Sequence, residues 1–171
     1  EEQPASPISP LGSSLMISER MIRDYAQANR LRYTILRSFA AAGGDTEAGL
    51  PEDLDNSMRL VPNLIAVAAG LRPQVTLQGS NYATRDGTSI RDYIHVEDLA
   101  DAHIMALNRS IPSDIYNLGT NQGISNHEII DYVNVKYGPV NVIVGARRPG
   151  DPDQLVADAS MARQMLGWSA K

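Results

Sequence analysis

Apolar and polar positions recur with two different periods along the chain, and this predicts helices and strands in succession. Between about residues 13 and 29 the apolar side chains recur close to every 3.6 positions, as in an amphipathic helix. Residues 33–39 are β-branched and apolar enough for a buried strand. Further strands are predicted at 75–77, 93–96, 115–118 and 140–144, and further helices at 62–70, 97–108, from 126, and from 158 to 167. This alternation indicates an α/β architecture.

Local signals mark several boundaries of these elements. Ser125 and Glu128 have the spacing of a capping box, which predicts a helix that starts near Asn126. The proline-rich residues 3–10 are typical of a surface loop. Residues 40–57 are rich in Gly, Asp and Glu and show no period, so we expect a long loop there.

Composition narrows the class of protein. The 171 residues are 43% apolar, enough for one ordinary core, and we expect a single domain over residues 1–171. The net charge is −5 and the 15 Lys and Arg are scattered, so no nucleic-acid partner is expected. Because no apolar run approaches the roughly 20 residues that span a bilayer and the start does not resemble a signal peptide, no membrane partner and a cytoplasmic location are expected.

Metal and disulfide chemistry are not expected. The chain contains no cysteine, which excludes disulfides and thiolate metal sites. His95, His103 and His127 have no ligand-like neighbours in the sequence, so we expect no metal site.

One long motif, RDGTSIRDYIHVEDLADAH at residues 85–103, carries most of the information on family. Shorter motifs support it in the same chain order: Ser9-Pro10-x-Gly12-x-Ser14, Leu36-Arg37-x-Phe39, Tyr116-Asn117-Leu118-Gly119, Arg147-Arg148-Pro149-Gly150-Asp151 and Leu166-Gly167-Trp168. Together they resemble UDP-glucose 4-epimerases of the extended short-chain dehydrogenase/reductase family. The resemblance covers nearly the whole chain but only the C-terminal, substrate-binding half of that family. It implies a few remnant parallel strands plus a small α/β substrate domain, with the N-terminal Rossmann half absent.

The resemblance also assigns roles in substrate binding. Arg91 and Arg148 match positions that hold the diphosphate of a UDP-sugar, and a guanidinium fork suits phosphate oxygens. Asp151 matches a position that binds the uridine ribose. Further substrate-site positions are held by Thr76 and Gln78, where backbone groups meet the uracil, and by Arg59, where an amide or imidazole is usual.

The catalytic pattern of the resembled family is missing. Its members oxidise the sugar at C4 with bound NAD, and they use a tyrosine as base with a lysine four residues later on the same helix face. Those two positions are Leu11 and Leu15 here, and leucine neither accepts a proton nor supplies a charge. The Gly43-Gly44-x-x-x-x-Gly49 stretch has the wrong spacing for a dinucleotide-binding turn. We therefore expect no catalytic residue and no cofactor in this chain.

Three functional hypotheses stay open at this point. The first is a catalytically inactive, truncated epimerase-like protein that keeps a site for UDP or a UDP-sugar. The second is a homo-oligomeric interaction or structural protein, because the strand at 33–39 and its helix should expose an apolar surface that a partner or second copy would cover. The third is one fragment of a split NAD-dependent epimerase.

Overall fold

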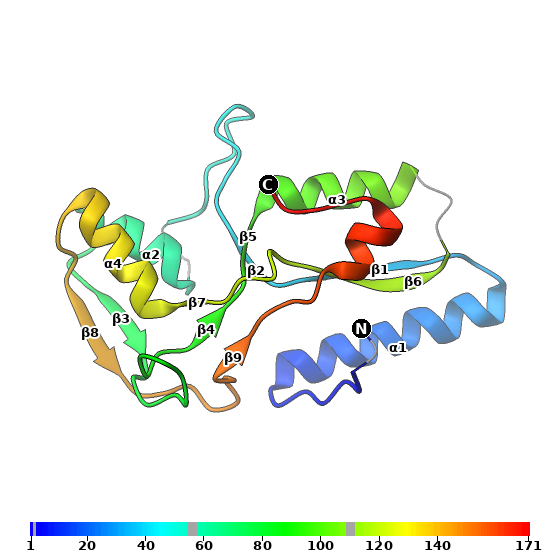
Figure 1. The fold of residues 1–171 in the computed structure, drawn as a ribbon, viewed down its shortest axis with the longest axis horizontal. Helices are drawn as coiled ribbons and strands as arrows, with labels where there is room; N and C mark the ends of the chain where they lie inside the picture. Colours follow the sequence, from blue (N-terminus) through cyan, green and yellow to red (C-terminus); the bar gives the residue numbers. More distant parts are fainter. Residues whose placement is uncertain (2, 55–57, 109–111) are drawn as a thin grey trace.

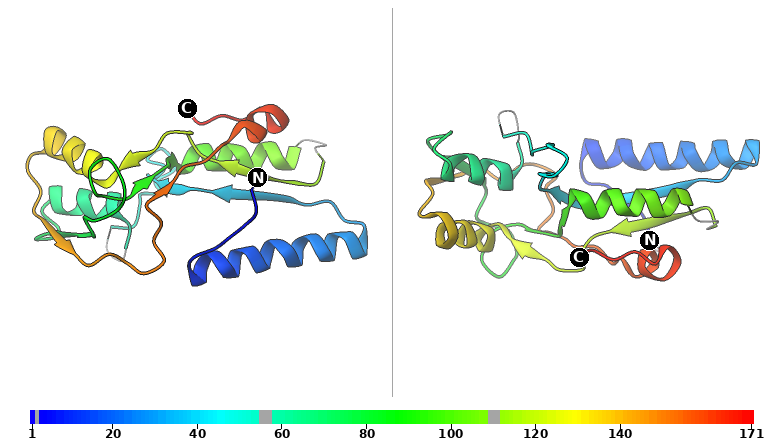
Figure 2. Two further views of the ribbon diagram at one scale, coloured as in Figure 1. Left: turned by 60° about the horizontal axis from the view of Figure 1, so that its bottom comes forward. Right: turned by 90° about the horizontal axis from the view of Figure 1, so that it is seen from above.

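The computed structural model describes residues 1, 3–54, 58–108 and 112–171. The molecule is elongated, with one group of elements around α3 and β6 and another around α2 and α4 (Figure 1), and the same two groups are visible from the other directions (Figure 2). Its helices are α1 (Pro10–Asn29), α2 (Leu60–Ala68), α3 (Val96–Asn108), α4 (Asn126–Tyr137) and the short π-helix η1 (Ala162–Leu166).

Most strands pair in parallel, as is usual where helices connect successive strands. The parallel pairs are β1 (Thr34–Ser38) with β6 (Asp114–Leu118), β2 (Ala40–Ala42) with β5 (Tyr93–His95), and β3 (Val75–Gln78) with β8 (Val142–Gly145). A small mixed sheet places β4 (Ile90–Arg91) between antiparallel β7 (Ile124–Ser125) and parallel β9 (Gln154–Leu155). The predicted α/β class is confirmed.

Two hydrophobic clusters hold the two groups of elements together. The larger cluster joins α3, β5, β6 and η1 around Tyr116 and Trp168, whose indole Nε1–H donates to the carbonyl oxygen of Asp98 at 2.8 Å. The smaller cluster joins α2, α4 and β3 and contains Leu64, Val75, Leu77, Ile130 and Val133. The assignment of a single domain stays a prediction.

The first helix begins earlier than the apolar pattern predicts and packs loosely. Ser9 caps it, because its hydroxyl accepts from the backbone N–H of Gly12 at 3.1 Å, and Pro10 occupies the first turn. Ala26 is the buried residue of this fully described helix. A bidentate ion pair joins α1 to β1, with Arg37 nitrogens 2.7 Å from each carboxylate oxygen of Glu19.

Two predicted elements differ in the structure. The loop expected at 40–57 begins with β2, because small alanine side chains pair in parallel with β5, and Asp45 and Leu50 form an isolated bridge within it. Its residues 55–57 lie outside the described part of the chain. The helix expected from Asp158 to Gly167 is reduced to one short helical segment, in which the Asp158 carboxylate accepts from the Ser160 N–H at 2.9 Å. Among the helices in the described ranges, none has the length and apolar character to cross a bilayer.

Candidate functional site

A cavity of about 460 Å³ lies where β2, β3 and β4 meet the N-terminal ends of α2 and α4, a size in the range of small-ligand sites. All the residues that the resemblance assigned to substrate binding line it: Arg59, Thr76, Gln78, Arg91, Arg148 and Asp151. They come from sequence positions far apart, so the fold brings them together. A larger hollow of about 650 Å³ beside the C-terminal part of α1 contains none of them.

Strand β3 presents an open edge in the described structure, since its one hydrogen-bonded neighbour is β8. The N–H groups of Val75 and Gly79 point towards β8, where they donate to the carbonyl oxygens of Asn141 and Gly145 at 2.9 and 3.2 Å. Backbone groups of successive residues in a strand point to opposite sides. The backbone groups of Thr76 and Gln78 therefore point to the open edge, where they can meet a planar ring with its own donors and acceptors.

Arg91 and Asp151 form an ion pair inside the cavity. One nitrogen of the Arg91 guanidinium contacts the Oδ1 of Asp151 and donates to the carbonyl oxygen of Pro152 at 2.9 Å, and the other donates to the Ile90 carbonyl at 2.7 Å. The two side chains are 15% and 27% exposed. The carboxylate of Asp151 therefore offsets the positive charge of Arg91, while both side chains still face the cavity.

Arg148 is the contrasting cation. Its side chain is exposed at the cavity and has no hydrogen bond or ion pair with the described part of the chain. The preceding residue, Arg147, is tied down by the carboxylate of Asp153 at 2.9 Å. Gly150 permits the tight turn behind Arg148, because its φ is +73° and an added Cβ would lie 2.5 Å from the carbonyl oxygen of Ile8.

Arg59 lies at the N-cap of α2 and holds the neighbouring loop. Its guanidinium donates to the Ala41 carbonyl at 3.0 Å and lies 2.5 Å from Glu52, whose second oxygen accepts from the Gly43 N–H at 3.0 Å. Among the described residues, no side-chain hydrogen bond caps this helix end, which faces the cavity through residues Leu60 to Asn63. An uncapped helix N-terminus carries partial positive charge and accommodates anions.

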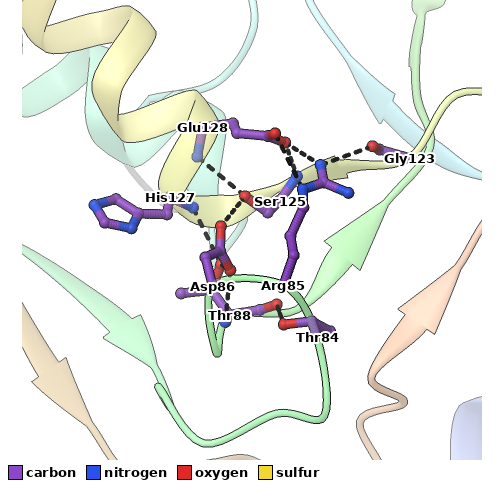
Figure 3. Close-up of polar contacts among 8 residues, drawn as sticks. All are labelled: Thr84, Arg85, Asp86, Thr88, Gly123, Ser125, His127 and Glu128. Atoms are coloured by element: carbon purple, nitrogen blue, oxygen red, sulfur yellow. Dashed lines mark hydrogen bonds and ion pairs between the residues drawn. The ribbon is translucent and has the colours of Figure 1, made fainter.

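A polar cluster fixes the turn before β4 onto the start of α4 (Figure 3). Asp86 accepts from the N–H and hydroxyl of Thr88 at 2.8 and 2.7 Å and from the hydroxyl of Ser125. Arg85 forms an ion pair with Glu128, which completes the predicted capping box with Ser125. Burial raises the pKa of Asp86, but the hydrogen bonds from Ser125 and Thr88 outweigh it and bring the net pKa below its ordinary value. The cluster sets the direction in which β4 carries Arg91.

A fully buried carboxylate fixes the other end of β4. Asp92 Oδ1 accepts from the N–H and hydroxyl of Thr120 at 2.8 and 2.6 Å. Its Oδ2 accepts from the backbone N–H groups of Asn121 and Ala157 at 3.0 and 3.1 Å. With donors on both oxygens, this side chain is satisfied without a partner cation. It fixes the backbone between Arg91 and Tyr93, which lie two positions apart and both line the cavity.

Leu11 and Leu15 lie one turn apart on α1, 69% and 56% exposed, and neither lines the cavity. The Tyr132 and Lys136 pair on α4 repeats the spacing of the family's catalytic residues. Tyr132 is 62% exposed and its hydroxyl lies 3.5 Å from the Lys136 ammonium. Both side chains are exposed, and neither lines the cavity.

The glycines after β1 do not form a turn that fits the pyrophosphate of NAD. In such a turn, glycine-rich backbone leads from a strand directly into a helix N-terminus. Here the stretch from Gly43 to Gly49 contains the Asp45–Leu50 bridge, and an added Cβ on Gly44 would meet the Leu50 carbonyl oxygen at 2.6 Å. Within the described residues there is also no group of three His, Cys, Asp or Glu that could hold a metal ion.

Several cavity residues were not assigned to the site from the sequence. Ser89, Tyr93 and Asn126 line the cavity, and Asn126 donates to the Ser89 hydroxyl at 3.0 Å. Burial raises the pKa of Tyr93 to about 12, so its hydroxyl keeps its proton. Asn126 was predicted as the first residue of a helix, and that position could have indicated a site at the helix end. No helix start or other local pattern indicates Tyr82, whose hydrogen-bond partner Asp151 lies 69 positions later in the chain.

Comparisons with known proteins show to which family the chain is similar. The family model "NAD dependent epimerase/dehydratase family" matches residues 1–119. UDP-glucose 4-epimerases from Lactobacillus helveticus and Azospirillum brasilense are both 41% identical over 175 aligned positions, which cover this whole chain and 53% and 50% of those proteins. The chain thus spans about half the length of these relatives.

Solved structures extend the likeness to three dimensions. The UDP-glucose 4-epimerase from Bifidobacterium longum in complex with NAD⁺ and UDP superposes with a TM-score of 0.90 at 35% identity, over 100% of this chain and 53% of that one. The enzyme from Stenotrophomonas maltophila, with bound NAD and formylated UDP-arabinopyranose, gives 0.90 at 37% identity over the same shares. With a family model that matches well over half of its residues, the chain belongs to the NAD dependent epimerase/dehydratase family.

Proposed function

We propose that this chain binds UDP or a UDP-sugar in the cavity around Arg91 and Arg148 and does not epimerise the sugar by itself. The observation that carries the proposal is the gathering of all the expected substrate residues in one cavity, among them Arg148, which has no partner among the described residues. A relative of the same fold is solved in complex with UDP, which supports this ligand class.

The diphosphate would lie between Arg148 and the N-terminus of α2. Arg148 has no internal anion to satisfy it in the described structure, so an incoming phosphate would not need to displace one. A hydrogen bond to a charged group contributes about 1.5–3 kcal/mol. Arg91 would add a second guanidinium, which Asp151 holds in place, and Arg59 would contribute less because Glu52 offsets its charge.

The uridine would occupy the opposite part of the cavity. The outward backbone groups of Thr76 and Gln78 on β3 can pair with the uracil edge, as main-chain donors and acceptors do in a strand. Asp151 would accept from the ribose hydroxyls. Along the cavity, the groups proposed to bind the base, the ribose and the diphosphate therefore come in the same order as these parts of the ligand.

Epimerisation is not proposed for this chain alone, because the side chains that would move the proton are missing. By the resemblance, Leu11 and Leu15 occupy the base and lysine positions, and neither lines the cavity. An epimerase assay with added NAD should give no turnover above a heat-inactivated control. Measurable turnover would contradict this part of the proposal.

A thermal-shift titration tests the binding. UDP and UDP-glucose should raise the melting temperature, whereas NAD should not. At a ligand concentration 100 times Kd, binding adds about 2.7 kcal/mol to the free energy of unfolding. Arg148→Ala should greatly reduce the shift at the same UDP concentration, and Arg163→Ala, which removes an exposed arginine of η1 outside the cavity, should preserve it. No shift of the wild-type protein at millimolar UDP would sink the proposal.

A second candidate function, self-association through α1, rests on a separate observation. One side of this helix exposes large apolar side chains, namely Leu11, Leu15, Ile17, Met21 and Tyr25. Such a surface is costly in water and favours contact with a second copy of the chain. Sedimentation equilibrium should show a concentration-dependent dimer that Met21→Glu dissociates and Gln27→Glu, on the polar side, does not. A monomer at all concentrations would refute this candidate.

A further inference from the structure

Tyr82 links two parts of the cavity that the sequence keeps apart. It lies in the turn after β3, is 4% exposed, and its hydroxyl oxygen is 2.8 Å from Oδ2 of Asp151 and 2.9 Å from the carbonyl oxygen of Gln78. The hydroxyl has one proton and faces two acceptors. The charged carboxylate of Asp151 is the stronger acceptor and accepts this hydrogen bond, so the hydroxyl holds the carboxylate expected at the ribose beside the end of the base-facing strand.

The ring of Tyr82 is itself held in place. The guanidinium carbon of Arg147 lies 4.1 Å from the ring centroid, a cation–π distance. The same guanidinium donates to the backbone carbonyl of Asp151 at 2.9 Å and pairs with Asp153. Burial is the larger cause, and the hydrogen bond to Asp151 the second, of a rise in the pKa of Tyr82 to about 12. The hydroxyl therefore keeps its proton at neutral pH.

The carboxylate of Asp151 is consequently fixed from two sides. Arg91 contacts Oδ1 and Tyr82 donates to Oδ2, so rotation about the Cβ–Cγ bond would break both contacts. A carboxylate has about four lone-pair sites, and two therefore remain for a ligand. Without Tyr82, Oδ2 would lose its fixed direction and the carboxylate could turn both oxygens towards Arg91.

We propose that Tyr82 is a positioning residue that holds Asp151 for vicinal ribose hydroxyls and so makes the cavity selective for ribonucleoside diphosphates. This rests on the proposed binding of UDP. Tyr82 need not touch the ligand, because its effect is transmitted through the orientation of Asp151. Preorganised groups of this kind lose little entropy when the ligand binds, which is why their loss reduces discrimination.

Calorimetric titrations of UDP and of 2′,3′-dideoxyuridine diphosphate test the inference. The wild-type protein should prefer UDP at least about tenfold, the effect of one charged hydrogen bond. Tyr82→Phe should reduce this preference to within about threefold, mainly because the variant binds UDP more weakly. A merely structural role of the hydroxyl would weaken both ligands equally and leave the ratio unchanged.

Two further variants make the test specific. Tyr116→Phe removes a buried hydroxyl that has no hydrogen-bond partner among the described residues, and it should keep the wild-type ratio. Arg147→Lys removes the planar group over the Tyr82 ring and should lower the ratio even if Tyr82→Phe folds poorly.

The outcomes separate this inference from the binding proposal. If Tyr82→Phe and Arg147→Lys keep the wild-type preference for UDP, the positioning role is wrong and UDP binding stands. If the wild-type protein binds UDP and the dideoxy analogue equally, the role is also wrong. If it binds neither, the binding proposal and the positioning role fail together.

Discussion

Arg91 and Arg148 carry the same guanidinium into one cavity but meet different surroundings. Arg91 is largely buried and is held by Asp151, Ile90 and Pro152, whereas Arg148 is exposed and makes no such contact with the described chain. The first residue therefore belongs to the folded framework as well as to the candidate site. The second is available to a ligand and contributes little to the framework.

Substitution by alanine should separate the two roles. Arg148→Ala should weaken UDP binding about 10- to 100-fold and change the free energy of unfolding by less than about 0.5 kcal/mol. Arg91→Ala should weaken binding and also lower that free energy by about 1–3 kcal/mol, because Asp151 loses its partner. Titration calorimetry and urea unfolding measure the two quantities. A large stability loss in Arg148→Ala would show that this arginine has a structural partner in solution.

At the scale of elements, one partly buried ion pair helps to place α1. Glu19 and Arg37 join this helix to β1, and the two side chains are 16% and 29% exposed. The hydrogen bond from Arg37 lowers the pKa of Glu19 from 4.5, although partial burial opposes it. Because the folded-state pKa is lowered, the pair stabilises the folded protein above about pH 4.5, and this stability is lost as pH falls through the folded-state pKa.

Glu19→Gln should reveal this dependence. Near neutral pH the variant should unfold about 1–2 kcal/mol more easily than the wild type, and the difference should shrink below pH 4.5. Amide hydrogen exchange along α1 should accelerate at the same time. Asp24→Asn breaks the exposed pair with Arg20 on the same helix and should change little. A difference that stays constant down to pH 3 would contradict the assigned role of Glu19.

The same scale shows what the sequence could predict. Long strands such as β1 and β6 and the capped helix α4 carry apolar runs or cap residues, and they were predicted within a few positions. The two-residue strands β4, β7 and β9 were missed, because so short a strand has no period and its partners are distant in sequence. The small alanines of β2 likewise gave no strand signal. Tertiary pairing, more than local propensity, defines these elements.

At the scale of the whole molecule, the candidate site lies between separately packed regions. One hydrophobic cluster supports β5 and the other supports β3 and α2, and residues of all three elements line the cavity. The resemblance predicted residues on both walls, which the structure brings together. It did not identify Tyr82, because a hydrogen bond between distant loops depends on the packed fold and leaves no local pattern.

Two-dimensional NMR of the ¹⁵N-labelled chain titrated with UDP tests the central claim most directly. Binding in the cavity should give saturable shifts of the amides at Thr76, Gln78 and Asp151 and at the start of α2. In Arg148→Ala these shifts should need about 10- to 100-fold more UDP to reach half-saturation. Amides of α1 near Leu11 and Leu15 should stay unperturbed. The absence of saturable shifts at millimolar UDP, or shifts confined to α1, would contradict a uridine nucleotide site in this cavity.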